Sequence, residues 1–213
     1  MSFDKNKLDL SLYLVASRQK RSDESFLNQV KNAILGGVSV VQLREKELSS
    51  REFFELGLKL KRLCDELCVP LLINDRLDIA LALECAGVHL GQDDLSVNVA
   101  RKLLGEQKII GLSVKTLAQL KNTAGADYLG CGAVFPSLSK ESELIGVKGV
   151  KELALNTNLK VVAIGGIDES NVLELKSSKI AGIAVIRALM QSVNAYETAL
   201  RLRAKIIQIK EAR

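Results

Sequence analysis

Short runs of β-branched and aliphatic residues recur eight times along the chain, and an amphipathic stretch separates each run from the next. The runs span residues 12–16, 38–43, 70–74, 87–90, 108–112, 128–133, 160–164 and 182–186. They are largely apolar, and few hairpin turn signals lie between them, which is typical of parallel strands buried on both faces. The alternation therefore indicates an α/β architecture with a parallel sheet.

The stretches between the runs carry the periodicity of helices. In the segment 49–67, Ser49 or Ser50 can cap a helix whose apolar side chains recur at Phe53, Leu56, Leu60, Leu63 and Leu67. Similar patterns predict helices over residues 24–35, 77–86, 97–104, 117–124, 150–155, 169–175 and 195–209. Eight strand and helix units predict a closed (β/α)8 barrel, and an open doubly wound sheet is the competing arrangement.

Composition limits the domain number and the class of partner. A chain of 213 residues with 47% hydrophobic side chains can bury one large core, so we expect residues 1–213 to form a single domain. The net charge is +5, but basic and acidic residues are interspersed and only 4% of residues are aromatic, so we expect small anionic substrates rather than nucleic acid. The four cysteines form no Cys-x-x-Cys pair, and signal-peptide and membrane-span patterns are missing, which predicts a soluble protein of the reducing cytoplasm. The apolar helices are compatible with a homodimer.

Polar side chains occupy alternate positions at the end of the second run, at Gln42, Arg44 and Lys46. Alternate residues of a strand point to the same side, so an amide and two cations would face one ligand. This predicts an anion site, with phosphate as the expected ligand. The alternative is an ordinary solvated loop.

Carboxylates follow the third and fourth runs. Asp75 stands between Asn74 and Arg76, and Asp93 and Asp94 follow the fourth run. The carboxyl ends of parallel strands meet at one mouth of a barrel, so Asp75 and one of Asp93 and Asp94 are candidate Mg²⁺ ligands. Alternatively, these residues only cap the helices that follow.

Two turns after the sixth and seventh runs suit a phosphate group. Ser137 and Ser139 alternate before Lys140, so hydroxyl donors precede a cation. Gly165 and Gly166 precede a predicted helix, where exposed backbone N–H groups can approach an anion. A plain polar turn and an ordinary tight turn are the alternatives.

Candidates for acid-base or covalent catalysis are sparse. The sole histidine, His89, lies within the fourth run and is either a satisfied core residue or an acid-base group. Lys115 follows the fifth run and is either a Schiff-base lysine or a solvated lysine at a helix start. The sequence offers no evident Ser/His/Asp or Cys/His nucleophilic arrangement.

Taken in order, these motifs resemble the thiamine phosphate synthase family over about residues 12–199. The likeness is carried by one motif at each strand end: Gln42-x-Arg44-x-Lys46, Asn74-Asp75-Arg76, Gly87-Val88-His89-Leu90-Gly91-Gln92-x-Asp94, Gly111-x-Ser113, Lys140 and Ile164-Gly165-Gly166-Ile167. The resemblance implies a TIM-barrel transferase that uses Mg²⁺ and two small-molecule substrates. It would join 4-amino-5-hydroxymethyl-2-methylpyrimidine pyrophosphate to 4-methyl-5-(2-phosphoethyl)thiazole, giving thiamine phosphate and pyrophosphate.

The resemblance also implies roles for the matched residues. The pyrimidine pyrophosphate would be held by Gln42, Arg44, Lys46, Asn74, Ser113 and Lys140. Among these, the expected catalytic residues are Arg44, Lys46, Ser113 and Lys140. Asp75 and Asp94 would bind Mg²⁺. The thiazole phosphate would lie near Ser137, Ser139, Gly166, Ile186 and Arg187, and the family often has a serine where this chain has Arg187.

Three other functions compete with this interpretation. A thiazole tautomerase of the same superfamily would carry a histidine where this chain has Lys115. A non-catalytic phosphate-binding barrel would need no metal carboxylates. A sugar-phosphate isomerase or epimerase would need an acid-base pair that the sequence does not present.

Overall fold

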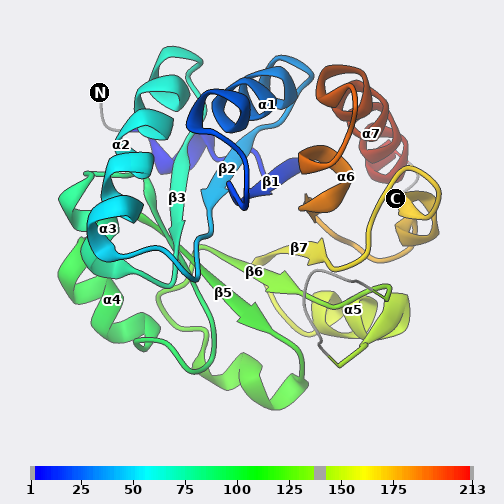
Figure 1. The fold of residues 1–213 in the computed structure, drawn as a ribbon. Coiled ribbons are helices and arrows are strands. Elements are labelled where there is room, and N and C mark those ends of the chain that lie inside the picture. The colour runs from blue at the N-terminus through cyan, green and yellow to red at the C-terminus, as the bar shows by residue number, and fades with distance from the viewer. Residues whose placement is uncertain (1–2, 137–142, 212–213) are drawn as a thin grey trace.

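The computed structural model describes residues 3–136 and 143–211. Its strands are all parallel and close into one barrel in sequence order (Figure 1). They are β1 (Leu12–Ala16), β2 (Val40–Leu43), β3 (Leu71–Asn74), β4 (Gly87–Leu90), β5 (Ile109–Val114), β6 (Tyr128–Cys131), β7 (Lys160–Ile164) and β8 (Gly182–Val185). Leu12 of β1 lies opposite Ile183 of β8, so the predicted closed barrel is confirmed and the open doubly wound alternative is wrong.

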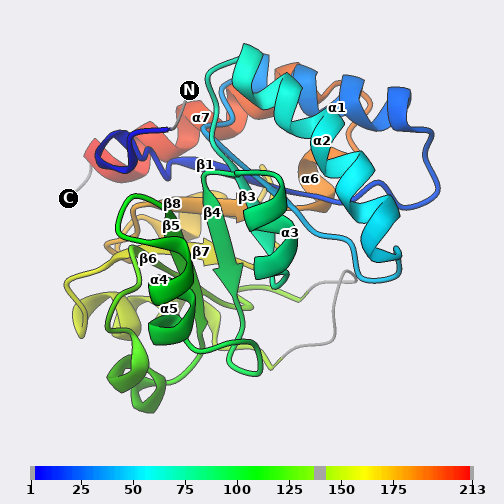
Figure 2. The same cartoon turned by 90° about the vertical axis from the view of Figure 1, so that its left-hand side faces the viewer.

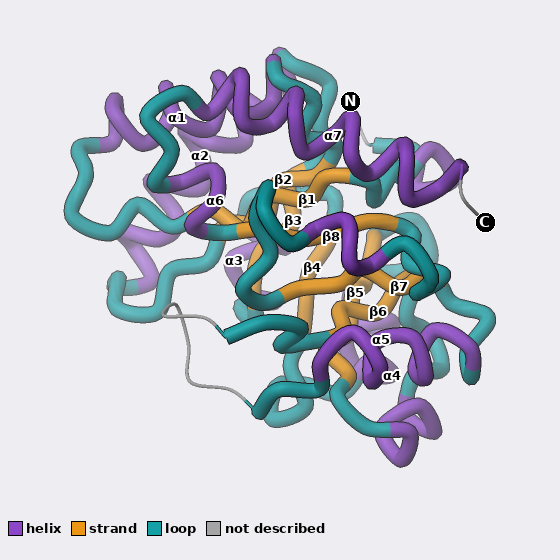
Figure 3. The backbone as a smooth tube through the Cα atoms, turned by 90° about the vertical axis from the view of Figure 1, so that its right-hand side faces the viewer, coloured by secondary structure: helices purple, strands orange, loops and turns teal. Residues whose placement is uncertain are grey.

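Helices surround the barrel on its outer face, as Figure 3 shows by the purple segments around the orange strands. The α-helices are α1 (Asp23–Leu35), α2 (Ser50–Glu66), α3 (Leu77–Ala82), α4 (Val97–Leu104), α5 (Gly146–Leu155), α6 (Arg187–Met190) and α7 (Ala195–Glu211). Short 3-10 helices are η1 (Lys5–Lys7), η2 (Leu117–Asn122) and η3 (Val172–Leu175). Within the described ranges, no helix combines the length and the hydropathy that a membrane span requires.

Several predicted boundaries were wrong. The predicted helix 77–86 ends at Ala82, because Glu84 takes a left-handed φ of 52° and turns the chain toward β4. The predicted helices 117–124 and 169–175 are the shorter 3-10 helices η2 and η3. Strand β5 continues to Val114 instead of ending at residue 112, so Lys115 follows directly on the strand. The short helix α6 was not predicted.

The barrel has two cores, one on each face of the sheet. Outward-facing strand residues pack against the helices in a large apolar cluster. Inward-facing residues form a smaller cluster in the barrel interior: Leu8, Leu10, Tyr13, Val15, Val40, Leu72, Ile109, Tyr128, Val162 and Ala184. Leu8 and Leu10 precede β1 and are 7% and 2% exposed, so this segment closes the barrel at the amino ends of its strands.

Two inward positions are glycine because rings fill the space beside them. A Cβ atom on Gly111 of β5 would lie 2.2 Å from Cζ of Tyr128 and 2.5 Å from Nδ1 of His89. A Cβ atom on Gly130 of β6 would lie 2.9 Å from Cε1 of His89. These contacts leave no room for a larger residue, so the glycines place both rings inside the barrel.

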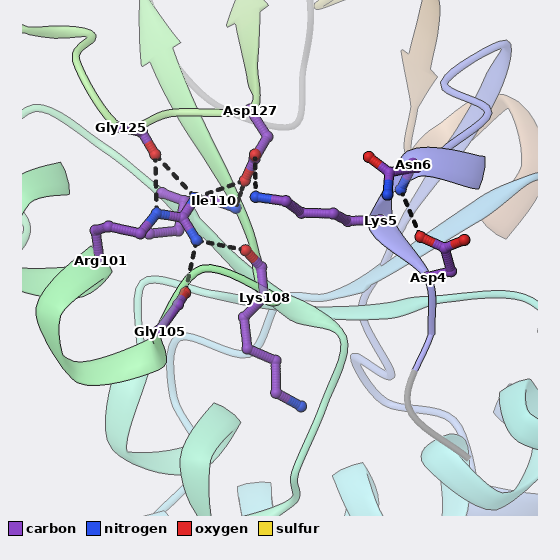
Figure 4. A network of polar contacts seen from close by, with 9 residues as sticks. All are labelled: Asp4, Lys5, Asn6, Arg101, Gly105, Lys108, Ile110, Gly125 and Asp127. Carbon is purple, nitrogen blue, oxygen red and sulfur yellow. Dashed lines mark hydrogen bonds and ion pairs between the residues drawn. The ribbon is translucent and has the colours of Figure 1, made fainter.

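A polar network fixes the loops at the amino ends of β5 and β6 (Figure 4). One carboxylate oxygen of Asp127 accepts from the Ile110 amide at 2.8 Å and from the Arg101 guanidinium at 2.7 Å, and the other accepts from Lys5 at 3.2 Å. Arg101 also donates to the carbonyls of Gly125 and Gly105 at 2.9 and 2.8 Å. The network therefore ties η1 and α4 to the base of the barrel.

Helix α7, the last helix, packs against the amino-terminal part of the chain. It packs against α1 and β1, and Arg203 of α7 donates to Asp9 at 2.7 Å. Figure 2 shows both chain ends on the same side of the molecule. The last helix thus covers the seam where β8 meets β1.

Candidate active site

A cavity of about 550 Å³ lies at the carboxyl ends of the strands. Every strand contributes at least one lining residue: Tyr13, Gln42, Asn74, His89, Ser113, Tyr128, Val162 and Ala184 are examples in chain order. Active sites of parallel barrels form at this end, because the loops that vary in chemistry all begin there. The position and the polar lining make this cavity the candidate active site.

Cations line the cavity after strands β2 and β5. Arg44 and Lys46 line it directly after β2, and the Arg44 amide donates to the Ala16 carbonyl at 2.9 Å, which fixes the start of this loop. The Lys46 ammonium is half-exposed and forms an ion pair with Asp75. Lys115 lines the cavity after β5. The cavity therefore combines these cations with the carboxylates of Asp75, Asp93 and Asp94.

Asp75 and Asp94 are two neighbouring carboxyl groups that also line the cavity. Burial raises the pKa of Asp75, but hydrogen bonds from Lys46 and Asp94 outweigh burial and lower it overall. Burial and the neighbouring Asp75 carboxylate raise the pKa of Asp94, although the Gly91 amide donates to its Oδ2 at 2.6 Å. Opposite shifts of this kind mean that the two groups share less negative charge than two free carboxylates.

The backbone holds Asp75 in place. Its φ of 59° lies in the left-handed region, which aspartate tolerates better than most residues. Its amide donates to the His89 carbonyl at 2.9 Å, so the end of β3 is tied to β4. A costly backbone conformation held by a neighbouring strand is common at functional sites.

A glycine turn follows β7 at the other side of the mouth. Gly165 lines the cavity, and both Gly165 and Gly166 have positive φ, at 102° and 65°. A Cβ atom on Gly166 would lie 2.5 Å from the Pro136 carbonyl oxygen, so the turn packs tightly against the segment after β6. Asn171 donates to the Gly166 carbonyl at 2.8 Å and fixes the turn.

A line of hydrogen bonds crosses the cavity floor. The Gln42 amide donates to the Tyr13 hydroxyl at 2.6 Å, and the two tyrosine hydroxyls of Tyr13 and Tyr128 lie 2.8 Å apart. Nδ1 of His89 lies 2.8 Å from the Tyr128 hydroxyl, and Nε2 lies 2.9 Å from Oγ of Ser113. Gln42, Tyr13 and Tyr128 are 3%, 1% and 0% exposed, so this line lies in the core.

Burial keeps these groups neutral. It raises the pKa of both Tyr13 and Tyr128, and it lowers the pKa of His89 to about 4. His89 is therefore an uncharged hydrogen-bonding imidazole near neutral pH. A buried group with hydroxyl partners on both ring nitrogens agrees with the satisfied histidine that the sequence favoured.

The structure places the predicted site residues in three groups. Those that line the cavity are Gln42, Arg44, Lys46, Asn74, Asp75, Asp94, Ser113 and Ile186. Gly166 and Arg187 each follow a lining residue in the chain without lining the cavity, and Nε of Arg187 donates to Gln191 at 2.9 Å. Ser137, Ser139 and Lys140 lie outside the described residues.

Sequence reasoning missed Tyr13, Tyr128 and Gln92 as cavity residues. Each tyrosine stands in a strand whose other residues are apolar or cysteine. The feature that could have identified them is a hydroxyl group on a side chain that faces the barrel interior. Gln92 lines the cavity and donates to the Ser113 carbonyl at 2.6 Å, which links the loop after β4 to β5.

Known proteins similar to this chain share one description. Residues 12–189 match the family described as thiamine monophosphate synthase. A thiamine-phosphate synthase of Campylobacter jejuni subsp. jejuni serotype O:23/36 (strain 81-176) is 54% identical over 204 residues, covering 96% of this chain and 97% of the relative. One from Enterococcus faecalis (strain ATCC 700802 / V583) is 46% identical, covering 85% and 87%. The solved structure of a thiamine phosphate pyrophosphorylase from Pyrococcus furiosus superposes with a TM-score of 0.84 at 35% identity, covering 95% of this chain and 98% of that one.

Proposed function

The chain belongs to the thiamine monophosphate synthase family, and from this premise we propose how its cavity carries out the reaction. The reaction joins 4-amino-5-hydroxymethyl-2-methylpyrimidine pyrophosphate to 4-methyl-5-(2-phosphoethyl)thiazole and yields thiamine phosphate and pyrophosphate. The enzyme is thus a transferase that acts on two small anionic molecules. Its cationic mouth suits both of them.

The bond changes need charge stabilisation more than proton transfer. The bond between the pyrimidine methylene carbon and the pyrophosphate oxygen breaks, and the electron pair leaves with pyrophosphate. The amino group of the pyrimidine ring delocalises the resulting positive charge. The thiazole nitrogen then donates its lone pair to the methylene carbon and forms the new bond. No protein nucleophile takes part, which agrees with the sparse acid-base groups in the cavity.

We propose that Arg44 and Lys46 stabilise the departing pyrophosphate. Both line the same wall, and negative charge grows on the leaving group as the bond breaks, so fixed cations stabilise the transition state more than the bound substrate. Gln42, Asn74 and Ser113 line the same cavity and would hold the pyrimidine pyrophosphate. The roles of Ser137, Ser139 and Lys140 stay predictions.

We propose that Asp75 and Asp94 bind Mg²⁺. Asp75 and Asp94 bring two carboxylates to the cavity lining, and the described residues contain no group of three or more His, Cys, Asp or Glu side chains that could hold a metal. Mg²⁺ is commonly held by one or two carboxylates together with water and substrate phosphates, so the pair fits the ion. When bound, Mg²⁺ supplies positive charge against the pyrophosphate.

The thiazole phosphate has a candidate site at the opposite side of the mouth. Gly165 and Ile186 line the cavity there, and Gly166 follows directly. We propose that backbone N–H groups of this turn bind the phosphate. The two substrates would then approach each other across the cavity, with proximity supplying much of the rate gain.

The observation that carries this proposal is that cations, paired carboxylates and a glycine turn from different strands line one cavity of a family member. Its test is thiamine phosphate formation by the purified protein with both substrates, with and without Mg²⁺, read as fluorescent thiochrome after oxidation. We expect product only with Mg²⁺. Asp75→Asn should lower turnover by about a hundredfold or more, because it removes one of the two proposed metal ligands and misplaces the leaving group.

Asp78→Asn is the matched control. Asp78 is three residues away, pairs with Arg76 on the surface and does not line the cavity. It should retain normal turnover. Magnesium-independent product, or equal loss in both variants, would contradict the metal assignment. Binding of the thiazole phosphate without any product would instead favour a tautomerase or a non-catalytic phosphate-binding barrel.

Location and assembly are further proposals. The described cysteines Cys64, Cys68, Cys85 and Cys131 are all free thiols, which supports a cytoplasmic location. Val99 and Leu103 of α4 are 42% and 55% exposed, which supports a homodimer, and sedimentation of the purified protein would test it.

A further inference from the structure

The hydrogen bonds across the cavity floor form an unbranched series from Gln42 to Ser113, through Tyr13, Tyr128 and His89. Each link is 2.6 to 2.9 Å long. The series starts in the barrel core, at side chains that are at most 3% exposed, and ends at Ser113 on the cavity wall. A serine at the end of such a series can have its hydroxyl hydrogen placed by the side chains that precede it in the series.

The donors and acceptors of these side chains give the hydrogen bonds of the series one direction. Gln42 donates an N–H to the Tyr13 oxygen, so the Tyr13 hydroxyl hydrogen is directed to the Tyr128 oxygen. The Tyr128 hydroxyl, which accepts from Tyr13, then donates to Nδ1 of His89. Nδ1 is therefore bare, and in a neutral imidazole the proton lies on Nε2, which donates to Ser113 Oγ.

We infer that Tyr13, Tyr128 and His89 are positioning residues that fix Ser113 as a hydrogen-bond donor to the substrate. Because Ser113 Oγ accepts from His89, its own hydrogen is free to point into the cavity. This inference rests on the proposed function, in which Ser113 contacts the pyrimidine pyrophosphate. It assigns a part in the reaction to three residues of the barrel core.

The charge at the cavity mouth requires the same direction. Arg44, Lys46 and Lys115 line the cavity with Ser113, and in the proposed function the ligand beside them is the anionic pyrimidine pyrophosphate. An anion accepts hydrogen bonds, and a serine that donates to it is favourable. In the reverse direction, Ser113 would donate to His89 and turn only lone pairs toward the anion. The Gln42 amide at one end of the series and the cations that line the cavity with Ser113 at the other end thus favour the same direction of hydrogen bonding.

Neighbouring contacts fix the positions of His89 and Ser113. The Ser113 carbonyl accepts from Gln92 at 2.6 Å, which fixes the backbone of β5 at this point. Gly111 and Gly130 leave room for the His89 ring, and a Cβ atom at either position would meet it at 2.5 or 2.9 Å. The ring therefore has little freedom to turn away from Ser113.

The tautomer of His89 tests the direction. His89 is the sole histidine, so protein labelled with ¹⁵N-histidine gives the signals of one imidazole. Long-range ¹H–¹⁵N correlation of the wild-type protein at pH 7 should show a protonated Nε2 and a bare Nδ1. In Tyr128→Phe, which removes the donor to Nδ1, we expect a mixture of tautomers. A protonated Nδ1 in the wild-type protein would overturn the inference.

Kinetics test whether the series acts through Ser113. Tyr128→Phe should lower kcat about tenfold and change KM less than about twofold, which is the size expected for one weakened hydrogen bond to a charged group. In a Ser113→Ala background, the same substitution should change kcat less than about twofold, because the hydroxyl it positions is gone. Tyr196→Phe is the matched control: Tyr196 is 40% exposed on α7, and its kcat should be unchanged.

The outcomes separate the inference from the proposed function. A protonated Nε2 in a protein that forms no product supports the direction of the series and removes the proposed function. Product formation with a protonated Nδ1, or with equal losses from Tyr128→Phe in both backgrounds, overturns the inference alone.

Discussion

At the scale of single residues, burial decides what His89 can do. It has hydroxyl partners on both ring nitrogens, and desolvation lowers its pKa from 6.5 to about 4. A histidine of this kind cannot serve as a proton store near neutral pH, and its use lies in the fixed placement of one hydrogen. The charged groups of the same cavity, Arg44 and Lys46, lie at the mouth instead of on the floor.

The lowered pKa of His89 predicts a loss of stability in mild acid. Between pH 6.5 and about 4 the unfolded chain protonates this imidazole and the native state does not, so stability falls as the pH falls through that window. From pH 7 to pH 5, the free energy of unfolding should decrease by about 2 kcal/mol more in the wild-type protein than in His89→Gln. Urea unfolding at both pH values measures it, and equal decreases would show that His89 is already solvated.

Residue-level prediction from sequence succeeded where side chains break a pattern. Gln42, Arg44 and Asp75 stand where an apolar run changes to polar residues, and all three line the cavity. Tyr13 and Tyr128 break no pattern, because tyrosine is common in buried strands. Their role depends on a contact between β1 and β6 that local sequence does not contain.

At the scale of elements, helices depend on their buried faces. Helix α2 begins with a full capping box, in which Ser49 and Glu52 satisfy each other's backbone groups, and its predicted start was accurate. The crossings 115–127 and 165–181 hold the 3-10 helices η2 and η3, whereas the shorter crossing 75–86 holds the α-helix α3. Periodicity alone could not separate these cases, because apolar side chains three residues apart suit both kinds of helix.

Helix α7 offers a matched pair of substitutions. Leu202 is 0% exposed, whereas Leu200 on the same helix is 41% exposed. Leu202→Ala should lower the free energy of unfolding by about 3 kcal/mol, because it leaves a cavity where α7 covers the barrel seam. Leu200→Ala should change it by less than about 0.5 kcal/mol. Urea unfolding of both variants measures this, and similar losses would mean that α7 is not held as the structure shows.

The network at the amino ends of β5 and β6 should affect stability without affecting activity. Asp127→Ala leaves the Ile110 amide without its hydrogen bond to the carboxylate. It also removes the ion-pair partner of Arg101, whose side chain is 12% exposed. We expect a loss of about 2 to 3 kcal/mol in urea unfolding. Lys5→Ala removes only the longer ion pair of the same carboxylate, at 3.2 Å, and should cost less than about 1 kcal/mol. Turnover per folded molecule should be normal in both, and a large loss of turnover would show that the two ends of the barrel are coupled.

At the scale of the whole molecule, the alternation of strands and helices predicted the barrel, and the family likeness agreed with it. Closure itself was beyond local sequence, since it rests on pairing between β1 and β8, at opposite ends of the chain. An open sheet and a closed barrel share the same strand pattern, and only the fit of all inward side chains separates them. The interior cluster, with its glycines beside two rings, supplies that fit.

Ligand binding should stabilise the whole fold, because the cavity takes residues from every strand. Pyrophosphate together with Mg²⁺, each at about a hundred times its Kd, should add about 2.7 kcal/mol and raise Tm by roughly 5 to 10 °C. Either one alone should give a smaller shift, since each supplies part of the other's site. The joint shift should disappear in Asp75→Asn, and thermal unfolding followed by circular dichroism measures it. A full shift without Mg²⁺ would contradict the shared site.

Leu8 and Leu10 close the barrel at the amino ends of the strands, so the cavity opens only at the carboxyl ends. Because the inner core fills the space below Tyr13 and Tyr128, both substrates enter and both products leave through the same opening. The closed base of the fold therefore leaves the open end as the passage for every substrate and every product.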